Sequence, residues 1–158
     1  GLGDVYKRQI NSLENPQDEV RINAEYYFAV CALNLFHQSV ETLLTRFVLD
    51  HPDHPKSKDV YLQLARHYYR MKKFSKSIEY FDKVDQYDLS IEDQNEFLFK
   101  LGYSKFVKKK FNEAKVHLNE LLQRESDYKI PATYFYSHIA YSEGKYQTSL
   151  IGLSLIHI

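Results

Sequence analysis

Two histidines in one short stretch are the residues of this sequence that come closest to a metal site. His51 and His54 alternate with Asp50 and Asp53, and imidazole with carboxylate is a ligand set that suits transition metals. A proline follows each histidine and biases the backbone before it toward extended geometry, which separates the side chains. We therefore expect a polar loop here, without a bound metal.

Glu113 and His117 stand four residues apart, a spacing that puts an acid and a base on one face of a helix. No nucleophile or second acid accompanies them in a catalytic pattern. Cys31 lies in an apolar run, which predicts a buried thiol that acts as a small hydrophobic residue. The five glycines are dispersed and form no phosphate-binding loop. We expect a protein that is not an enzyme and needs no cofactor.

Basic residues gather at 105 and 108–110, and again at 70, 72 and 73. Such runs are typical of nucleic-acid or lipid surfaces. Both groups, however, close predicted helices, where cations complement the carbonyl end of the helix dipole. The chain carries 21 basic and 21 acidic side chains, so its formal net charge is zero. We expect no nucleic-acid partner, and an RNA-reading helical repeat is the remote alternative.

Aromatic side chains are abundant, while turn-forming residues are scarce. The 158 residues include 14 Tyr and 10 Phe but only 5 Gly and 4 Pro. This composition predicts few turns and many packed rings. No window approaches the roughly 18 uninterrupted apolar residues of a membrane span, so we expect none in this chain.

Three segments share a short turn that ends in an aromatic residue, with a small residue three positions later. The turns are MKKF at 71–74, KKKF at 108–111 and EGKY at 143–146, and the small residues are Ser77, Ala114 and Ser149. Val40 extends the series upstream, and the successive spacings are 37, 37 and 35 residues. A period slightly above 34 predicts a repeated helix-turn-helix unit.

The second unit resembles the tetratricopeptide repeat (TPR) family, whose motif is W-x2-L-G-x2-Y followed by A-x3-F. The matching residues are Tyr61, Leu64, Ala65, Tyr68, Ser77 and Phe81. The resemblance implies an all-α fold, a right-handed α-solenoid of antiparallel helical hairpins. Small residues such as Ala29, Gly102 and Ala114 would let helices approach closely, while larger ones such as Leu118 and Leu121 would fill the spaces between hairpins.

We place the repeat array at residues 10–152. Its parts are the tail of a preceding repeat at 10–22, repeat one at 23–55 with a first helix near 24–35, repeat two at 58–92, repeat three at 95–128 and a truncated repeat four at 131–152. DVYKRQ at 4–9 and LSLIHI at 153–158 can be encoded by one DNA element read in opposite directions. That element resembles a transposase end from sequencing libraries, so we expect residues 1–9 and 153–158 to be adapter-derived.

In the TPR family, the first helix of each hairpin lines a concave groove that holds a peptide or a partner helix. By position, the resemblance places Tyr, Phe and Arg side chains there, types enriched at binding hot spots. The set is Leu62, Arg66, Tyr69, Arg70, Phe99, Tyr103, Phe106, Tyr134, His138 and Tyr141. For Phe106 and Tyr141, contact with the next hairpin is the alternative. The resemblance implies a protein or peptide partner and leaves the oligomeric state open.

The sequence LLTRFVLDHPDHP at 43–55, with the Tyr-rich segment 61–84, looks like bacterial periplasmic TPR proteins that assist outer-membrane assembly or Tol-Pal function. This resemblance implies a scaffold in the bacterial cell envelope. A regulatory or adaptor domain of a larger enzyme or signalling protein is the alternative.

Overall fold

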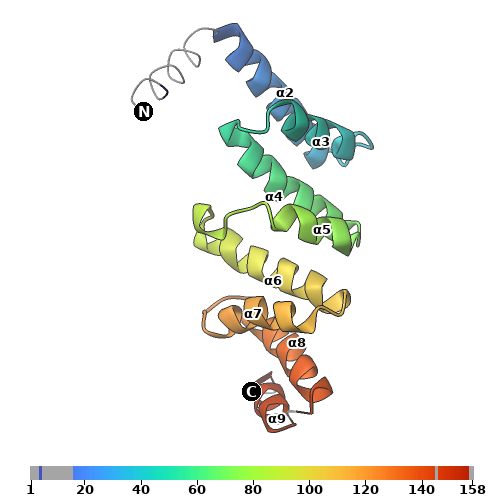
Figure 1. Cartoon of the computed structure of the whole chain (residues 1–158), viewed down its shortest axis with the longest axis vertical. Helices are drawn as coiled ribbons and strands as arrows, with labels where there is room; N and C mark the ends of the chain where they lie inside the picture. The colour runs from blue at the N-terminus through green and yellow to red at the C-terminus, as the bar shows by residue number, and fades with distance from the viewer. Residues whose placement is uncertain (1–3, 5–15, 145, 157–158) are drawn as a thin grey trace. The chain divides into compact units, whose positions relative to one another are not determined.

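The computed structural model describes Asp4, residues 16–144 and residues 146–156, and there the chain consists of helices and turns. The predicted all-α class is confirmed for these residues (Figure 1). The α-helices are α2 (Pro16–Asn34), α3 (Val40–Asp50), α4 (Pro55–Arg70), α5 (Phe74–Phe81), α6 (Ile91–Val107), α7 (Phe111–Leu122), α8 (Lys129–Ser142) and α9 (Tyr146–Ile156), and the 3₁₀ helix η1 spans Gln86–Asp88. The chain divides into two compact units, Gly1–Val60 and Tyr61–Ile158.

In the first unit, α2 packs on α3 through small and branched apolar side chains. The buried residues are Ala29, Ala32, Leu33, Val40, Leu44, Phe47 and Val48. A hydrogen bond joins α2 to the start of α4, because the Tyr26 hydroxyl donates to the Asp59 carboxylate at 2.6 Å. The other face of α2 is solvent-facing, with Phe28 65% exposed. Cys31 is exposed as well, so the predicted burial of its thiol is wrong.

Helix α2 begins earlier than the sequence suggests. Its first residue is Pro16, and Asp18 and Glu19 occupy the first turn. Proline at the first helical position and acids near the amino end both favour a helix start. Residues 16–22 therefore belong to the same helix as residues 23–34, and the predicted boundary between a repeat tail at 10–22 and repeat one at 23 falls within α2. Residues 10–15 lie outside the described residues.

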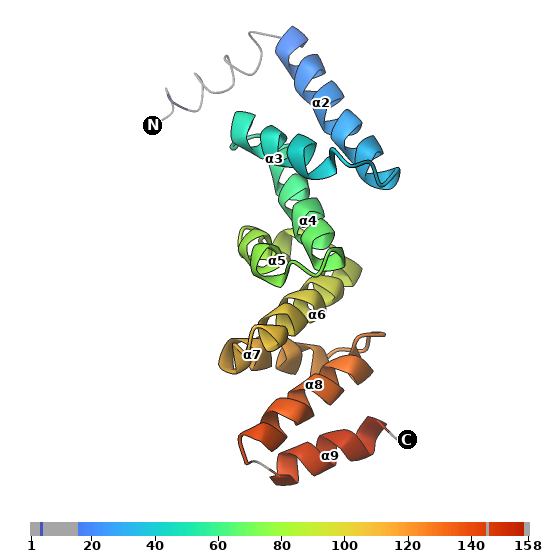
Figure 2. The same cartoon turned by 90° about the vertical axis from the view of Figure 1, so that its right-hand side faces the viewer.

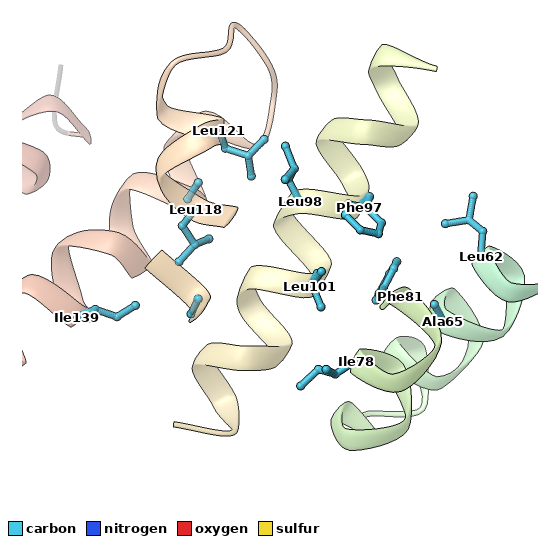
Figure 3. Close-up of a cluster of buried hydrophobic side chains, with 12 residues drawn as sticks. Leu62, Ala65, Ile78, Phe81, Phe97, Leu98, Leu101, Leu118, Leu121 and Ile139 are labelled. Carbon is cyan, nitrogen blue, oxygen red and sulfur yellow. The ribbon is translucent and has the colours of Figure 1, made fainter. Parts of the chain in front are cut away.

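In the second unit, consecutive helices from α5 to α9 lie side by side in chain order (Figures 1 and 2). Buried side chains from α4 to α8 form one core, and Figure 3 shows Phe97, Leu98 and Leu101 of α6 between Phe81 of α5 and Leu118 of α7. Each of these five side chains is at most 5% exposed. Helix α6 is thus covered on two sides.

Small residues stand at close helix contacts of the second unit. A methyl group built on Gly102 would lie 3.1 Å from both Cγ and Cδ2 of Leu118, tighter than ordinary packing. Ser77 is fully buried, and its hydroxyl donates a 3.0 Å hydrogen bond to the Ala65 carbonyl across α4 and α5. Ala114 is also fully buried. Gly102, Ser77 and Ala114 therefore lie where helices pack against each other.

The repeated turns share one backbone geometry. Lys72, Lys109 and Gly144 hold the same place in their turns, and their φ values are +56°, +60° and +76°. In the first turn, the amides of Lys72 and Lys73 donate to the carbonyls of Tyr69 and Tyr68, each at 2.9 Å. This is the Schellman arrangement, in which a left-handed residue satisfies the last helix carbonyls. Lys109 and Lys110 repeat it at the end of α6.

Three helices begin a few residues earlier than the repeat motif predicts. Helices α4, α6 and α8 begin at residues 55, 91 and 129, ahead of the predicted repeat boundaries at 58, 95 and 131. At α6, the Ser90 hydroxyl accepts a 3.1 Å hydrogen bond from the Asp93 amide, as an N-cap does. Helix α9 continues through residues 153–156, which we expected to be adapter-derived; residues 1–3, 5–9 and 157–158 lie outside the described residues. Among the described helices, none has both the length and the apolarity to cross a bilayer.

Candidate functional site

Aromatic rings from α4 to α8 form one continuous cluster in the second unit, named here the ring cluster. Each ring has its centroid within 6.4 Å of another ring of the set. The members are Tyr69, Phe74, Phe99, Tyr103, Phe106, Phe111, Tyr128, Tyr134, Phe135 and His138. Pairs at such separations attract one another through edge-to-face and offset contacts.

Tyr103 of α6 is the centre of the ring cluster. Its centroid lies 4.9 Å from Phe135 of α8, 6.0 Å from Tyr69 of α4 and 5.8 Å from Phe74 of α5. The ring of Phe99 stacks on its other side at 6.1 Å. A single half-buried tyrosine therefore joins rings from four helices.

The helical repeat explains why these rings meet. Phe99, Tyr103 and Phe106 are spaced by four and three residues along α6, so they share one helix face. Phe74 and Phe111 are the aromatic residues that follow the repeated turns. Each folds back on a ring from the preceding helix, Phe74 on Tyr69 and Phe111 on Phe106. The aromatic residues after the turns and the aromatic face of α6 thus belong to one surface.

The exposure of the ring cluster rises toward α8. Tyr134 is 48% exposed, and His138 is also exposed, although its ring still contacts Phe106 at 5.3 Å. Tyr69, Phe99, Tyr103 and Phe106 are half-buried. The cluster therefore has a packed interior and an accessible rim.

Leu62 does not belong to this surface. It was expected to be exposed, but it is 4% exposed and packs in the core with Phe81 and Phe97. Leu62 stands three residues before Ala65, which is fully buried, and residues at this spacing share a helix face. The expectation about Leu62 is wrong, because a position taken from the family pattern does not show which face of α4 is buried in this chain.

Arg66 is held in an ion-pair network beside the ring cluster. Its guanidinium donates to Asp93 and to Glu96 of α6, and Lys100 donates to Glu96. Burial opposes the charge of Arg66, but the bonds and charges of Glu96 and Asp93 outweigh it and raise its pKa. The pKa of Glu96 is likewise raised by burial but lowered more strongly by Arg66 and Lys100. These four charges cancel and tie α4 to α6.

Tyr69 keeps its phenol neutral over an unusually wide pH range. Burial, followed by the charges that Tyr103 and Tyr128 would carry, raises the pKa of Tyr69 to about 12. The Lys100 ammonium also lies over the Tyr69 ring, 5.3 Å from its centroid. The hydroxyl of Tyr69 can therefore act as a hydrogen-bond donor at any physiological pH.

The ring cluster also contains four residues that the sequence analysis missed. Of the remaining predicted residues, Arg70 and Tyr141 are exposed near the carboxyl ends of α4 and α8. The residues missed by position are Phe74, Phe111, Tyr128 and Phe135. Phe74 and Phe111 could have been found, because the turn motif marked both. Tyr128 and Phe135 carried no such signal.

His51 and His54 each face an acid from α2. His51 Nε2 lies 2.8 Å from Glu25, and His54 Nε2 lies 3.4 Å from Glu19. Both imidazoles also contact the Phe47 ring, at centroid distances of 5.1 and 6.2 Å. The histidines thus join the loop after α3 to α2. Within the part of the chain that the structure describes, no group of three or more His, Cys, Asp or Glu side chains is arranged to hold a metal ion.

Glu113 and His117 meet at a buried lysine. Lys105 Nζ lies 3.1 Å from Glu113, 3.3 Å from His117 Nε2 and 3.8 Å from Asp82. The Lys105 residue is only 7% exposed. Burial and the Lys105 charge lower the pKa of His117, so the neutral ring accepts a hydrogen bond from the ammonium group. This cluster joins α5, α6 and α7.

Comparisons with protein-family models, with curated proteins and with solved structures found no match for this chain. Its function is therefore inferred from the residues and their geometry. The TPR resemblance stays a prediction. The ring cluster is the candidate binding surface.

Proposed function

We propose that this chain is a non-catalytic interaction module, a TPR-like α-solenoid that binds a peptide or helix of a partner protein on the ring cluster. The observation that carries the proposal is the cluster itself, because the rings come from successive helices and are half-exposed at the rim. Rings with polar edges are the side chains that dominate binding hot spots. A setting in the bacterial envelope remains a prediction of the resemblance.

The packing of the ring cluster favours binding over a purely structural role at its rim. The interior rings of Tyr103, Phe106 and Phe135 hold each other in place, so a ligand meets a preformed surface and loses little entropy in ordering it. Tyr134 and His138 lie at the exposed edge, where their removal leaves the core intact. An apolar residue of a peptide would cover these rings and remove them from water.

Selection from a random-sequence peptide library against the full chain tests the proposal. We expect enriched peptides whose affinity falls about tenfold when Tyr134 is changed to Ala, as for a contact worth about 1.4 kcal/mol. Tyr87→Ala is the matched control, since Tyr87 is 80% exposed and lies outside the ring cluster. Circular dichroism of each variant verifies that the helices are retained.

Two results would reject the proposal. One is a selection that enriches no peptide above the level found with an unrelated helical protein. The other is an affinity that Tyr134→Ala leaves unchanged, or that Tyr87→Ala lowers equally, because neither pattern locates binding at the ring cluster.

A further inference from the structure

A basic cavity of about 390 Å³ opens where the α4–α5 turn meets the end of α6. Four lysines and three smaller or apolar residues line it. They are Lys72, Lys73, Lys76, Lys108, Phe74, Ser75 and Val107. All four lysines are exposed in part to solvent, and Phe74 and Val107 supply an apolar wall.

Two of the four lysines of the basic cavity have no acidic partner among the described residues. Lys72 and Lys108 form no ion pair with any residue that the structure describes. Lys73 and Lys76 are positioned by the Tyr68 ring, with Nζ 5.8 and 4.9 Å from its centroid. The sequence from 64 to 78 contains no Asp or Glu, and neither does 97–112. The cavity therefore concentrates positive charge on a chain that is neutral overall.

The basic charge of the cavity does not continue along α6. Residues 82–96 include six acids and only one lysine, and Asp93 and Glu96 are paired with Arg66 and Lys100. A helix of 17 residues is about 25 Å long, so a basic patch confined to its end suits a short acidic segment better than a long polyanion such as nucleic acid.

The basic cavity is continuous with the ring cluster. Phe74 lines the cavity and also contacts Tyr69 and Tyr103, with ring centroids 5.8 Å apart in both pairs. A peptide that covers the rings can therefore extend past Phe74 into the cavity without leaving the protein surface. The cavity and the cluster form two neighbouring parts of one surface with different chemistry.

We propose that the basic cavity binds Asp or Glu side chains of the partner peptide whose apolar residues lie on the ring cluster. This inference rests on the proposed function and adds the chemistry of the partner, an apolar segment next to an acidic one. Lysine ammonium groups act as point charges without fixed geometry, so the cavity selects for negative charge more than for one carboxylate arrangement. Binding through it weakens as salt rises.

The test uses the peptides enriched on the full chain, each made in two forms, with its Asp and Glu residues kept or changed to Asn and Gln. We expect enriched peptides to carry acids beside an apolar segment, and the acidic form to bind more tightly. We expect the double variant Lys72→Gln, Lys108→Gln to weaken the acidic form roughly fivefold, as for two partly exposed charge contacts, and to leave the neutral form unchanged.

The matched control is Lys58→Gln, Lys129→Gln, which removes the same charge outside the cavity and should leave both affinities near those of the wild type. Equal loss in the control would overturn the cavity assignment, since it would show only general charge attraction. Peptides without an acidic preference would also overturn it, while leaving the proposed function intact if Tyr134→Ala still weakens them. Failure to enrich any peptide would reject both proposals.

Inorganic phosphate, single-stranded RNA and phosphatidylglycerol vesicles complete the experiment at physiological salt. We expect none of them to compete with the acidic peptide at concentrations near its dissociation constant. Competition by one of them that Lys72→Gln, Lys108→Gln abolishes would assign the basic cavity to that anion instead and would overturn the peptide proposal.

Discussion

Lys105 shows how one buried charge can organise its surroundings. Its ammonium group faces Glu113 and Asp82, which compensate its charge, and His117, which accepts a hydrogen bond while neutral. Burying an unpaired charge is costly, so these partners are needed for the fold to keep a lysine at this depth. Glu113 and His117, the acid and base noted in the sequence, hold the lysine in place.

This arrangement predicts a pH dependence of stability. The pKa of His117 is lowered in the folded chain, so the unfolded chain binds a proton that the folded chain resists. The stability contributed by neutral His117 is complete above its ordinary pKa of about 6.5 and is lost as the pH falls below that value. Urea unfolding from roughly pH 7.5 down to roughly pH 5 measures the loss. We expect His117→Gln to lose less stability over this interval than the wild type, and equal losses would contradict the assignment.

Cys31 offers a second test at this scale. Its thiol is exposed on α2, so a thiol reagent such as Ellman's reagent should modify it in the folded chain at a rate close to that in urea. It is the only cysteine, so the absorbance change reports this position alone. A rate suppressed a hundredfold or more in buffer would mean that the surface of α2 is covered.

Cys31 and Leu62 show what the sequence could not predict about single residues. An apolar run indicates a face that can be buried, but not whether another helix covers it. Cys31 lies in such a run on a helix with one uncovered side, and Leu62 lies on the covered side of its helix. The aromatic residues Tyr69 and Tyr103, in contrast, were placed on the surface by the family resemblance, and both contribute to the ring cluster.

At the level of the helix pairs, the left-handed turn residue is a point of local strain. Lys109 adopts φ of +60°, a conformation that costs a residue with a Cβ about 1–2 kcal/mol, whereas glycine adopts it freely. We expect Lys109→Gly to raise the free energy of unfolding by about 0.5–1 kcal/mol after the added entropy of the unfolded chain is counted. Chemical denaturation measures the change.

Lys108→Gly is the control for this prediction. It removes the same charge one position earlier, where φ is −80° and glycine brings no relief. We expect it to be neutral or destabilising. If both variants stabilise the chain equally, loss of charge repulsion rather than backbone geometry is the cause.

The close contact at Gly102 gives a prediction of opposite sign. Gly102→Leu would drive its side chain into Leu118 of α7 and force α6 and α7 apart, with an expected loss of about 1–3 kcal/mol. Ala114→Leu should behave similarly, because Ala114 is fully buried. Val116→Leu on the 66% exposed side of α7 is the control, and we expect it to stay within about 0.5 kcal/mol of the wild type. Unchanged thermal melting of Gly102→Leu would contradict the packing described.

The sequence located the contacts between helices better than the helix ends. Only small residues fit at buried helix contacts such as Ser77 and Ala114. These positions therefore recur in the sequence at a regular spacing that can be recognised. Helix starts depend on caps such as Ser90, and many residues can cap a helix, so the repeat spacing alone does not mark them.

At the scale of the whole molecule, the helices differ in how fully their neighbours cover them. In α6, Leu98 and Leu101 are at most 2% exposed, because α5 and α7 pack on both sides. In α2, Val20 and Phe28 are 68% and 65% exposed. Local opening should therefore cost more free energy in α6 than in α2. Hydrogen exchange read by mass spectrometry should show slower exchange in α6, and equal rates in both helices would contradict this difference.

The all-helical class followed from the repeat spacing and the family resemblance, but the distribution of charge did not. The zero net charge gave reason to expect no electrostatic partner site, yet the lysines near 72 and 108 meet at one cavity. The sequence did not reveal this cavity, because Lys72 and Lys108 are far apart in the chain and only the packing of successive turns brings them together. A net charge sums over the whole surface and loses such local differences.

The ring cluster also gives the chain a built-in optical signal. The sequence has 14 tyrosines and no tryptophan, so tyrosine emission is not masked, and Tyr69, Tyr103, Tyr128 and Tyr134 all stand in or beside the proposed binding surface. A peptide that carries one tryptophan would accept excitation energy from these donors when it docks. Its sensitised fluorescence would report occupancy directly, without a dye attached to either molecule.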